Sequence, residues 1–153
     1  MNGHEDTKIT RSGGPPDVVV RFGQDRAAPG VVRRALARLF DGEDDPIAHD
    51  ALLSASELVS NVVLHTDGGG EIRAWDPKPD VPMRMEVEDS DQSIPEPLPS
   101  PNPGHSGGRG LMLLDRLSDA WGVFTTAVGK VVWAEFDRDR RRNRASRVGR
   151  SPR

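Results

Sequence analysis

The 153-residue sequence contains no cysteine, so neither a disulfide nor a thiolate metal site can form. It also lacks tyrosine, and aromatic residues make up only 5% of the chain, which disfavours a surface that stacks nucleic-acid bases. No apolar run approaches the roughly 18 residues that a membrane span needs, and residues 1–16 lack the apolar segment of a secretory signal. These absences predict one soluble, cytoplasmic domain that binds neither membranes nor, directly, nucleic acid.

Charge is unevenly distributed along the chain, although the net charge is only −3. Residues 138–153 contain eight Arg and one Asp, a net charge of +7, whereas residues 1–137 contain 13 Lys or Arg and 23 Asp or Glu, a net charge of −10. We expect a disordered N-terminus over 1–16, a folded domain over 17–137 and a disordered Arg-rich tail over 138–153. The alternative for the tail is an electrostatic arm for nucleic acid or an acidic partner.

Hydrophobic patterning predicts five strands and three helices in the folded part. Strands are expected over 18–22, 71–75, 83–87, 121–126 and 130–136, and helices over 27–40, 47–66 and 110–117. Residues 90–106 contain five prolines and predict a long loop of the kind that often forms a lid. The order of elements predicts an α/β two-layer sandwich, with a mixed, mostly antiparallel sheet covered on one face by three helices.

Three polar residues share one face of the expected second helix. Glu57, Asn61 and His65 are spaced four apart, so their side chains follow one another along the same side. In so apolar a helix, the carboxylate and the carboxamide either face water or point into a pocket. A solvated face therefore remains open for this helix taken alone, and His65 could instead lie against the C-terminal carbonyl groups of the helix.

Two later segments favour the pocket. Asp89 ends an apolar strand, and Gly108, Arg109 and Gly110 open an apolar helix, where glycine lets the backbone approach a phosphate group. Plainer alternatives also remain open: Asp89 as a turn residue, the glycines as a helix entry, and Arg109 as a solvated side chain. Because a base, a metal-binding amide, an acid and a glycine-rich helix start occur together, the sequence indicates nucleotide binding.

Other nucleotide-binding and catalytic motifs are absent from the sequence. Neither a P-loop nor a dinucleotide-binding glycine motif is present. Lys130 follows Gly129, but Val131 comes next and all three lie at or near an expected strand rather than before a helix. The four histidines are scattered without the spacing of metal ligands.

The ordered segments resemble the N, G1 and G2 boxes of the GHKL (Bergerat-fold) ATPases. The resemblance rests on Glu57 and Asn61 on a helix, Asp89 at a strand end, and Gly108-Arg109-Gly110-Leu111 at a helix start. Within that superfamily, the segments Ser-Glu-Leu-Val-Ser-Asn and Gly-Lys-x-Val-Trp-Ala-Glu are similar to bacterial anti-sigma factor serine kinases, especially the actinobacterial ones. The resemblance covers about residues 18–136.

The resemblance implies a site for ATP and Mg²⁺. It implies that Asn61 binds Mg²⁺, that Glu57 is the general base for the attacking hydroxyl, and that Asp89 accepts a hydrogen bond from the adenine amino group. Residues 90–106 would form the ATP lid. The remaining nucleotide-binding residues would be His65, Gly108, Arg109, Gly110 and Leu111.

The sequence departs from the family in two places. Residues 89–93 lack the glycines that usually follow the acid of the G1 box, as is often so in the actinobacterial branch. Val131 stands where the closing strand usually has a threonine that supports the acid near adenine. That substitution removes one polar contact and bears on nucleotide affinity rather than on the fold.

The implied function is that of an ATP-binding anti-sigma factor with serine/threonine-protein kinase activity. Such a protein would bind a sigma factor, phosphorylate a serine of an anti-anti-sigma (STAS-type) partner, regulate transcription in this way, and act as a homodimer. The alternative is an ATP-binding protein-interaction regulator that transfers no phosphate. A histidine kinase catalytic domain is a third class, disfavoured because only residues 1–16 precede the first expected strand.

Overall fold

The computed structural model describes residues 14–91 and 109–148, and its five strands form a single sheet. In the order β1-β2-β3-β5-β4, the strands are β1 (Val18–Phe22), β2 (Gly70–Trp75), β3 (Met83–Asp89), β5 (Lys130–Phe136) and β4 (Ala120–Thr125). Each pair of neighbouring strands in this described sheet is antiparallel. The sheet is therefore antiparallel throughout rather than mixed.

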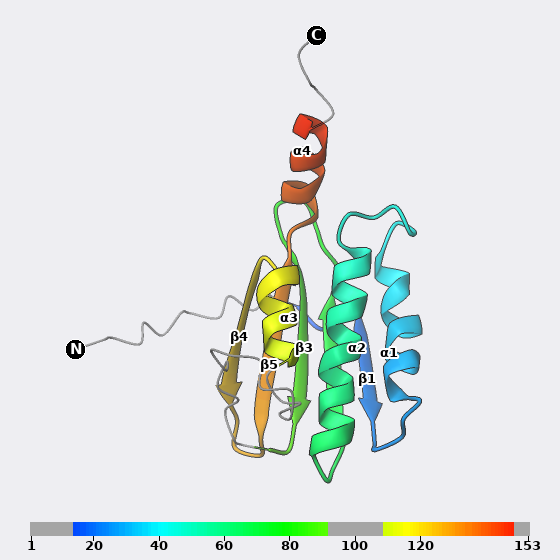
Figure 1. Cartoon of the computed structure of the whole chain (residues 1–153), viewed down its shortest axis with the longest axis vertical. Coiled ribbons are helices and arrows are strands. Elements are labelled where there is room, and N and C mark those ends of the chain that lie inside the picture. Colours follow the sequence, from blue (N-terminus) through cyan, green and yellow to red (C-terminus); the bar gives the residue numbers. More distant parts are fainter. Residues whose placement is uncertain (1–13, 92–108, 149–153) are drawn as a thin grey trace, which may run out of the picture.

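Three helices cover one face of the sheet, as Figure 1 shows for α1, α2 and α3. The helices are α1 (Ala28–Leu36), α2 (Ala48–His65), α3 (Arg109–Leu117) and α4 (Arg138–Val148), and a short 3₁₀ turn, η1 (Ala37–Leu39), follows α1. The predicted α/β two-layer sandwich is confirmed, although α1 ends four residues earlier than the sequence predicted. Among these described helices, none combines the length and the apolar character that crossing a bilayer requires.

The core lies between the helices and the inner face of the sheet. Side chains alternate between the two faces of a strand, and the inner positions Ile72, Val87 and Val132 are all buried. Val32 of α1 and Val59 of α2 are completely buried against this layer. The apolar stripes of the helices thus determine which face of each strand points inward. Because side chains alternate along a strand, this also determines the face on which each remaining side chain of that strand lies.

Residues 66–70 end α2 and lead the chain into the sheet. The Thr66 hydroxyl donates a hydrogen bond of 2.8 Å to the carbonyl of Val62 in the last helical turn. Gly69 has a φ of 69°, and a Cβ there would lie 2.2 Å from the carbonyl oxygen of Phe22. Only glycine fits this close approach of β1, so Gly69 lets β2 pair with β1 immediately after α2 ends.

The outer face of the sheet carries paired charges. Arg73 donates a 2.6 Å hydrogen bond through Nε to Glu71 and also pairs with Glu88 on the next strand. The hydrogen bond with Glu71 raises the pKa of Arg73, and the hydrogen bonds from Arg21 and then Arg73 lower the pKa of Glu71. This ladder of opposite charges across neighbouring strands satisfies a sheet face that no described helix covers.

The expected disordered tail is wrong for residues 138–148, which form α4. Arg138 pairs with Asp45 at 2.6 Å, and Arg141 pairs with Asp50 at 2.5 Å and with Asp119 at 3.3 Å. These acids lie in the connection before α2, in the first turn of α2, and just after α3. The helix is ordered because its arginines meet carboxylates from distant parts of the chain, and local composition does not reveal such contacts.

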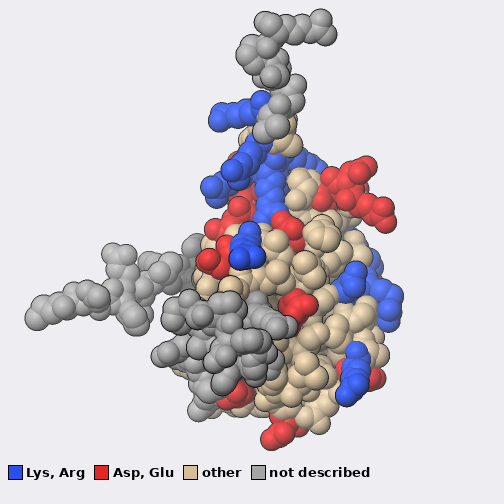
Figure 2. Space-filling model, viewed as in Figure 1, with Lys and Arg blue, Asp and Glu red and all other residues tan. Residues whose placement is uncertain are grey.

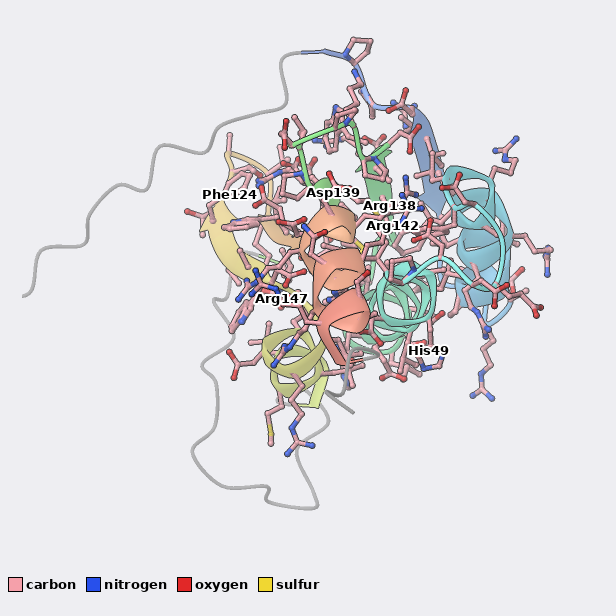
Figure 3. All side chains as sticks on the ribbon, turned by 90° about the horizontal axis from the view of Figure 1, so that it is seen from above. His49, Phe124, Arg138, Asp139, Arg142 and Arg147 are labelled. Carbon is pink, nitrogen blue, oxygen red and sulfur yellow. The ribbon has the colours of Figure 1, made fainter. Side chains whose placement is uncertain are left out.

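The arginines of α4 divide into an anchored side and a solvent side. Figure 3 shows Arg138 and Arg142 on the side of α4 that faces α1 and α2, and Arg147 on the opposite side. Arg144 and Arg147 are exposed and form no ion pair with a described residue. Figure 2 shows the resulting concentration of basic side chains on α4, which extends beyond the sandwich.

Residues 1–13 and 149–153, which were also predicted to be disordered, lie outside the described part of the chain. The carbonyl of Gly14, inside the segment expected to be disordered, accepts a hydrogen bond of 3.0 Å from the indole nitrogen of Trp75.

Candidate functional site

A cavity of about 180 Å³ lies between α2, α3 and the inner face of β3 and β5. Apolar side chains form its walls and polar ones gather at the ends of these elements. The lining residues are Leu58, Asn61, Val62, His65, Thr66, Val87, Asp89, Asp91, Leu111, Lys130 and Val132. Because pockets for whole drug-sized ligands span about 300–1,000 Å³, this cavity is sized for part of a ligand, such as a heterocyclic base.

Helix α2 delivers two of its three predicted polar residues to the cavity. Asn61 is half-buried and His65 is the last, exposed residue of the helix, and both line the cavity. Glu57 lies one turn before Asn61 and is half-buried, but it does not line the cavity. The carboxylate of Glu57 forms no ion pair or hydrogen bond with a described residue, so it is available to a group that approaches from outside the cavity.

Asp89 lies at the end of β3, is 7% exposed and contacts two neighbouring groups through its carboxylate. Its Oδ1 accepts a hydrogen bond of 2.8 Å from the backbone N–H of Asp91. Its Oδ2 lies 3.3 Å from Nζ of Lys130, which is its register partner on β5. A buried carboxylate with a fixed orientation in an otherwise apolar pocket is suited to accept a hydrogen bond from a ligand.

Lys130 lines the cavity but was not among the site residues predicted from the sequence. Its side chain is 11% exposed, and Nζ lies 3.6 Å from the carboxylate of Asp91 as well as near Asp89. The available signal was strand alternation, because Lys130 and Val132 point to the same face and Val131 to the other. Val131 is buried on the outer face and does not line the cavity. The structure therefore shows no direct contact through which Val131 would change nucleotide affinity as expected.

Gly129 allows β5 to approach Asp89 closely enough for this pairing. A Cβ on Gly129 would lie 1.7 Å from the backbone oxygen of Asp89, a distance that only a backbone shift can relieve. The strand ends that carry Asp89 and Lys130 would then have to separate. The glycine that precedes Lys130 is thus part of how the cavity is built.

We expect Gly129→Ala to lower the free energy of unfolding by about 1–3 kcal/mol, the usual cost of forcing extra volume into a packed site. Denaturant titration followed by circular dichroism measures this difference. The matched control is Gly23→Ala, because a Cβ on Gly23 meets no heavy atom within 4 Å. Equal stability losses in the two variants would show that the close approach at Gly129 does not affect the free energy of unfolding.

Helix α3 brings Leu111 to the cavity. Arg109 and Gly110 open this helix, and Leu111 is 3% exposed. Gly108 and the side chain of Arg109 fall outside the part of the chain that the structure describes, as do residues 92–106 of the expected lid. Of that lid, Ser90 and Asp91 are described, and Asp91 lines the cavity.

The donor set of the cavity restricts which cation it could hold. Within the described residues, no group of three or more His, Asp or Glu side chains is arranged to enclose a metal ion. Asn61 places a carboxamide at the cavity wall, and its oxygen is of the hard type that Mg²⁺ prefers. Mg²⁺ is commonly bound by one or two protein oxygens together with water and phosphate oxygens, so this arrangement fits Mg²⁺ better than a cation that needs a complete protein cage.

Comparison with known proteins identifies relatives of this domain. The family described as histidine kinase-like ATPase domain matches residues 23–136. No curated protein sequence matches the chain significantly. The crystal structure of the RsbU and RsbW domains of Rv1364c from Mycobacterium tuberculosis is similar, with a TM-score of 0.56 and 22% identity over 80% of this chain and 32% of that chain.

A second similar structure is the blue-light activated histidine kinase of Erythrobacter litoralis EL346. It has a TM-score of 0.48 and 21% identity over 81% of this chain and 44% of that chain. The present chain thus spans about a third to a half of the length of these two structures. At these identities the likeness to the mycobacterial protein concerns the fold alone.

Proposed function

The chain belongs to the histidine kinase-like ATPase domain family, and from this we propose that it is an ATP-binding anti-sigma factor with serine-protein kinase activity. One observation carries the proposal: Asn61, Asp89 and Leu111, from three separate segments, line the same cavity. We further propose that it acts as a homodimer, binds a sigma factor, and phosphorylates a serine of an anti-anti-sigma (STAS-type) partner.

The apolar walls and the buried acid suit an adenine base. Leu58, Val62, Val87 and Val132 supply apolar side chains that would contact the faces of the base. Asp89 would accept a hydrogen bond from its amino group, since an ionised carboxylate can only accept and an aromatic amino group donates. The half-enclosed space would bury the base and leave the sugar and phosphates to extend past it.

The phosphates would extend past Asn61 toward the start of α3. Asn61 would hold Mg²⁺, and a bound Mg²⁺ would neutralise charge on the phosphate oxygens. Backbone N–H groups of the first turn of α3, beginning at Arg109, suit an anion because they have no partner within the helix. We assign Gly108, Arg109 and Gly110 to phosphate contacts on the same grounds, and His65 to a nucleotide contact because it lines the cavity.

Glu57 would act as the general base. It lies one turn before Asn61 and its carboxylate has no partner among the described residues, so it could accept the proton of a serine hydroxyl that attacks the terminal phosphate. Phosphoryl transfer requires mainly positioning and charge neutralisation. A partner protein that presents its serine beside α2 would complete the site.

A second candidate function is an ATP-binding regulator that binds proteins and transfers no phosphate. It is favoured by the place of Glu57 outside the cavity lining. Transfer of labelled phosphate from ATP to STAS-type proteins of the source organism distinguishes the two, because only the kinase labels them.

We expect millimolar Mg-ATP to raise the melting temperature of the protein. A ligand that binds only the folded state stabilises it by RT ln(1 + [L]/Kd), which is about 2.7 kcal/mol when the ligand is at 100 times Kd. Differential scanning fluorimetry at several Mg-ATP concentrations measures the shift.

Asp89→Ala serves as the matched variant for this measurement. Loss of a buried hydrogen-bond partner costs about 1–3 kcal/mol, or roughly tenfold in affinity, so the shift should need about ten times more Mg-ATP. Asp89→Asn should lie between the two, because an amide can partly replace the carboxylate. An unchanged melting curve of the wild type would contradict nucleotide binding, and an unaffected Asp89→Ala would place the adenine site elsewhere.

A further inference from the structure

Lys130 lies inside the proposed base site but has no part in the roles assigned so far. Its side chain is 11% exposed, and its ammonium group faces the cavity beside Asp89. Burying a charged amine is costly unless it is paired and hydrogen-bonded. Because its ammonium group is largely removed from water, the presence of a lysine at this position needs an explanation.

The described contacts of the ammonium group leave at least one of its N–H donors unused. Nζ lies 3.3 Å from Asp89 and 3.6 Å from Asp91, which are ion-pair distances rather than short hydrogen bonds. No other described residue pairs with Nζ. Since an ammonium group has three N–H donors, at least one can turn toward a ligand that enters the cavity.

We propose that Lys130 is a base-specificity residue, which donates a hydrogen bond to a ring nitrogen next to the 6-amino group of adenine. This inference rests on the proposed ATP site. The juxtaposition that carries it is the pairing of Asp89 and Lys130 in register across β3 and β5, with both side chains lining the cavity.

The pair of side chains is complementary to one edge of adenine. The 6-amino group donates, and each ring nitrogen next to it, N1 on one side and N7 on the other, accepts. Asp89 offers an acceptor and Lys130 a donor, side by side and both nearly buried. A base that presents its amino group to Asp89 thus brings one of these nitrogens toward Nζ.

Lys130 also changes the electrostatic environment of a base that enters the cavity. Without it, the buried carboxylate of Asp89 would be opposed only by the N–H of Asp91. The ammonium group beside it compensates this buried charge, whereas the second carboxylate near Lys130, that of Asp91, is 42% exposed and remains in contact with water. A neutral heterocycle can then displace water without facing an uncompensated anion.

The test compares ATP with 1-deaza-ATP and 7-deaza-ATP, which replace one ring nitrogen each by a carbon. Isothermal titration calorimetry measures the three affinities for the wild type and for Lys130→Met. We expect one of the two analogues to bind the wild type about tenfold or more weakly, as for loss of a hydrogen bond to a charged group. In Lys130→Met that difference should fall to within about twofold, because the donor is gone.

Lys78→Met is the matched control, since Lys78 is an exposed lysine in the turn between β2 and β3. It should keep the wild-type difference between ATP and the analogue. Lys130→Gln retains an N–H donor and should keep part of it. A merely structural Lys130 would lower the affinities for all three nucleotides in parallel.

The proposal is overturned if both analogues bind the wild type as tightly as ATP, or if the difference is the same in Lys130→Met. If Lys130→Met fails to fold, the wild-type comparison can still overturn the proposal, and Lys130→Gln, which should keep only part of the difference, tests whether the difference arises at Lys130. Failure of the underlying ATP site would look different: ATP itself would not bind the wild type.

Discussion

Replacing Glu57 by alanine is expected to slow phosphate transfer by about 10²–10⁴-fold, the range for loss of a general base, while Mg-ATP binds within about twofold of wild type. The reason is position: Glu57 does not line the cavity, and its carboxylate forms no ion pair or hydrogen bond with a described residue. Asn61→Ala should fail in the opposite way. Asn61 lines the cavity, and its loss should weaken Mg-ATP binding about tenfold.

Calorimetry measures the two affinities, and labelling of a STAS-type partner from radioactive ATP measures transfer. Glu57→Gln is the matched variant, because it keeps the size and polarity of the side chain and removes its basicity. It should be as slow as Glu57→Ala. If Glu57→Ala loses Mg-ATP affinity as severely as Asn61→Ala, Glu57 contacts the nucleotide or its metal and is not the base. If transfer is unaffected, the base lies elsewhere.

The sequence predicted the parts of the site that depend on local spacing. Residues four apart on a helix share a face whatever the rest of the chain does, so Asn61 and His65 both reach the cavity. Asp89 was identified because an acid ends an apolar strand. For Glu57, spacing predicted the face but not the depth, because only the packing of α2 on the sheet determines where the cavity ends.

Two misses share a physical cause, since each depends on residues far apart in the sequence. Lys130 faces the cavity because β5 pairs in register with β3. In the sequence it stood out only as a lysine after a glycine, without a P-loop, and as part of the Gly-Lys-x-Val-Trp-Ala-Glu segment. Helix α4 was predicted as disordered because its composition is polar and basic. Its order comes from acids about 20 to 100 positions away, which balance charges that would otherwise repel one another.

Replacing Arg138 by methionine is expected to lower the free energy of unfolding by about 3 kcal/mol, the lower end of the cost of breaking a buried ion pair. The Asp45 side chain is 0% exposed and lies 2.6 Å from Arg138, which also donates a 3.1 Å hydrogen bond to the carbonyl of Leu39. The variant keeps two backbone N–H donors on Asp45, from Asp41 and Ile47. These remaining bonds place the expected loss at the lower end.

Denaturant titration at pH 7 measures this loss, and Arg144→Met provides the control. Arg144 lies on the same helix and is exposed without an ion pair to a described residue, so its replacement should change stability by less than about 0.5 kcal/mol. Equal losses in both variants would mean that α4 acts through its total charge. Mg-ATP affinity should survive in Arg138→Met, since none of these residues lines the cavity.

The pH dependence gives an independent check on the same ion pair. Burial alone would raise the pKa of Asp45, but hydrogen bonds from the backbone of Asp41 and Ile47 and from Arg138 outweigh it and hold the pKa below its ordinary value of 3.8. A carboxyl whose pKa is lower in the folded protein stabilises the fold above the unfolded pKa, and this contribution is lost as the pH falls through the folded pKa. The difference between wild type and Arg138→Met should therefore be constant from neutral pH to about pH 5 and shrink below about pH 4. A difference that stays unchanged down to pH 2 would mean that Arg138 stabilises the fold through its packing and its bond to Leu39, and not through the charge of Asp45.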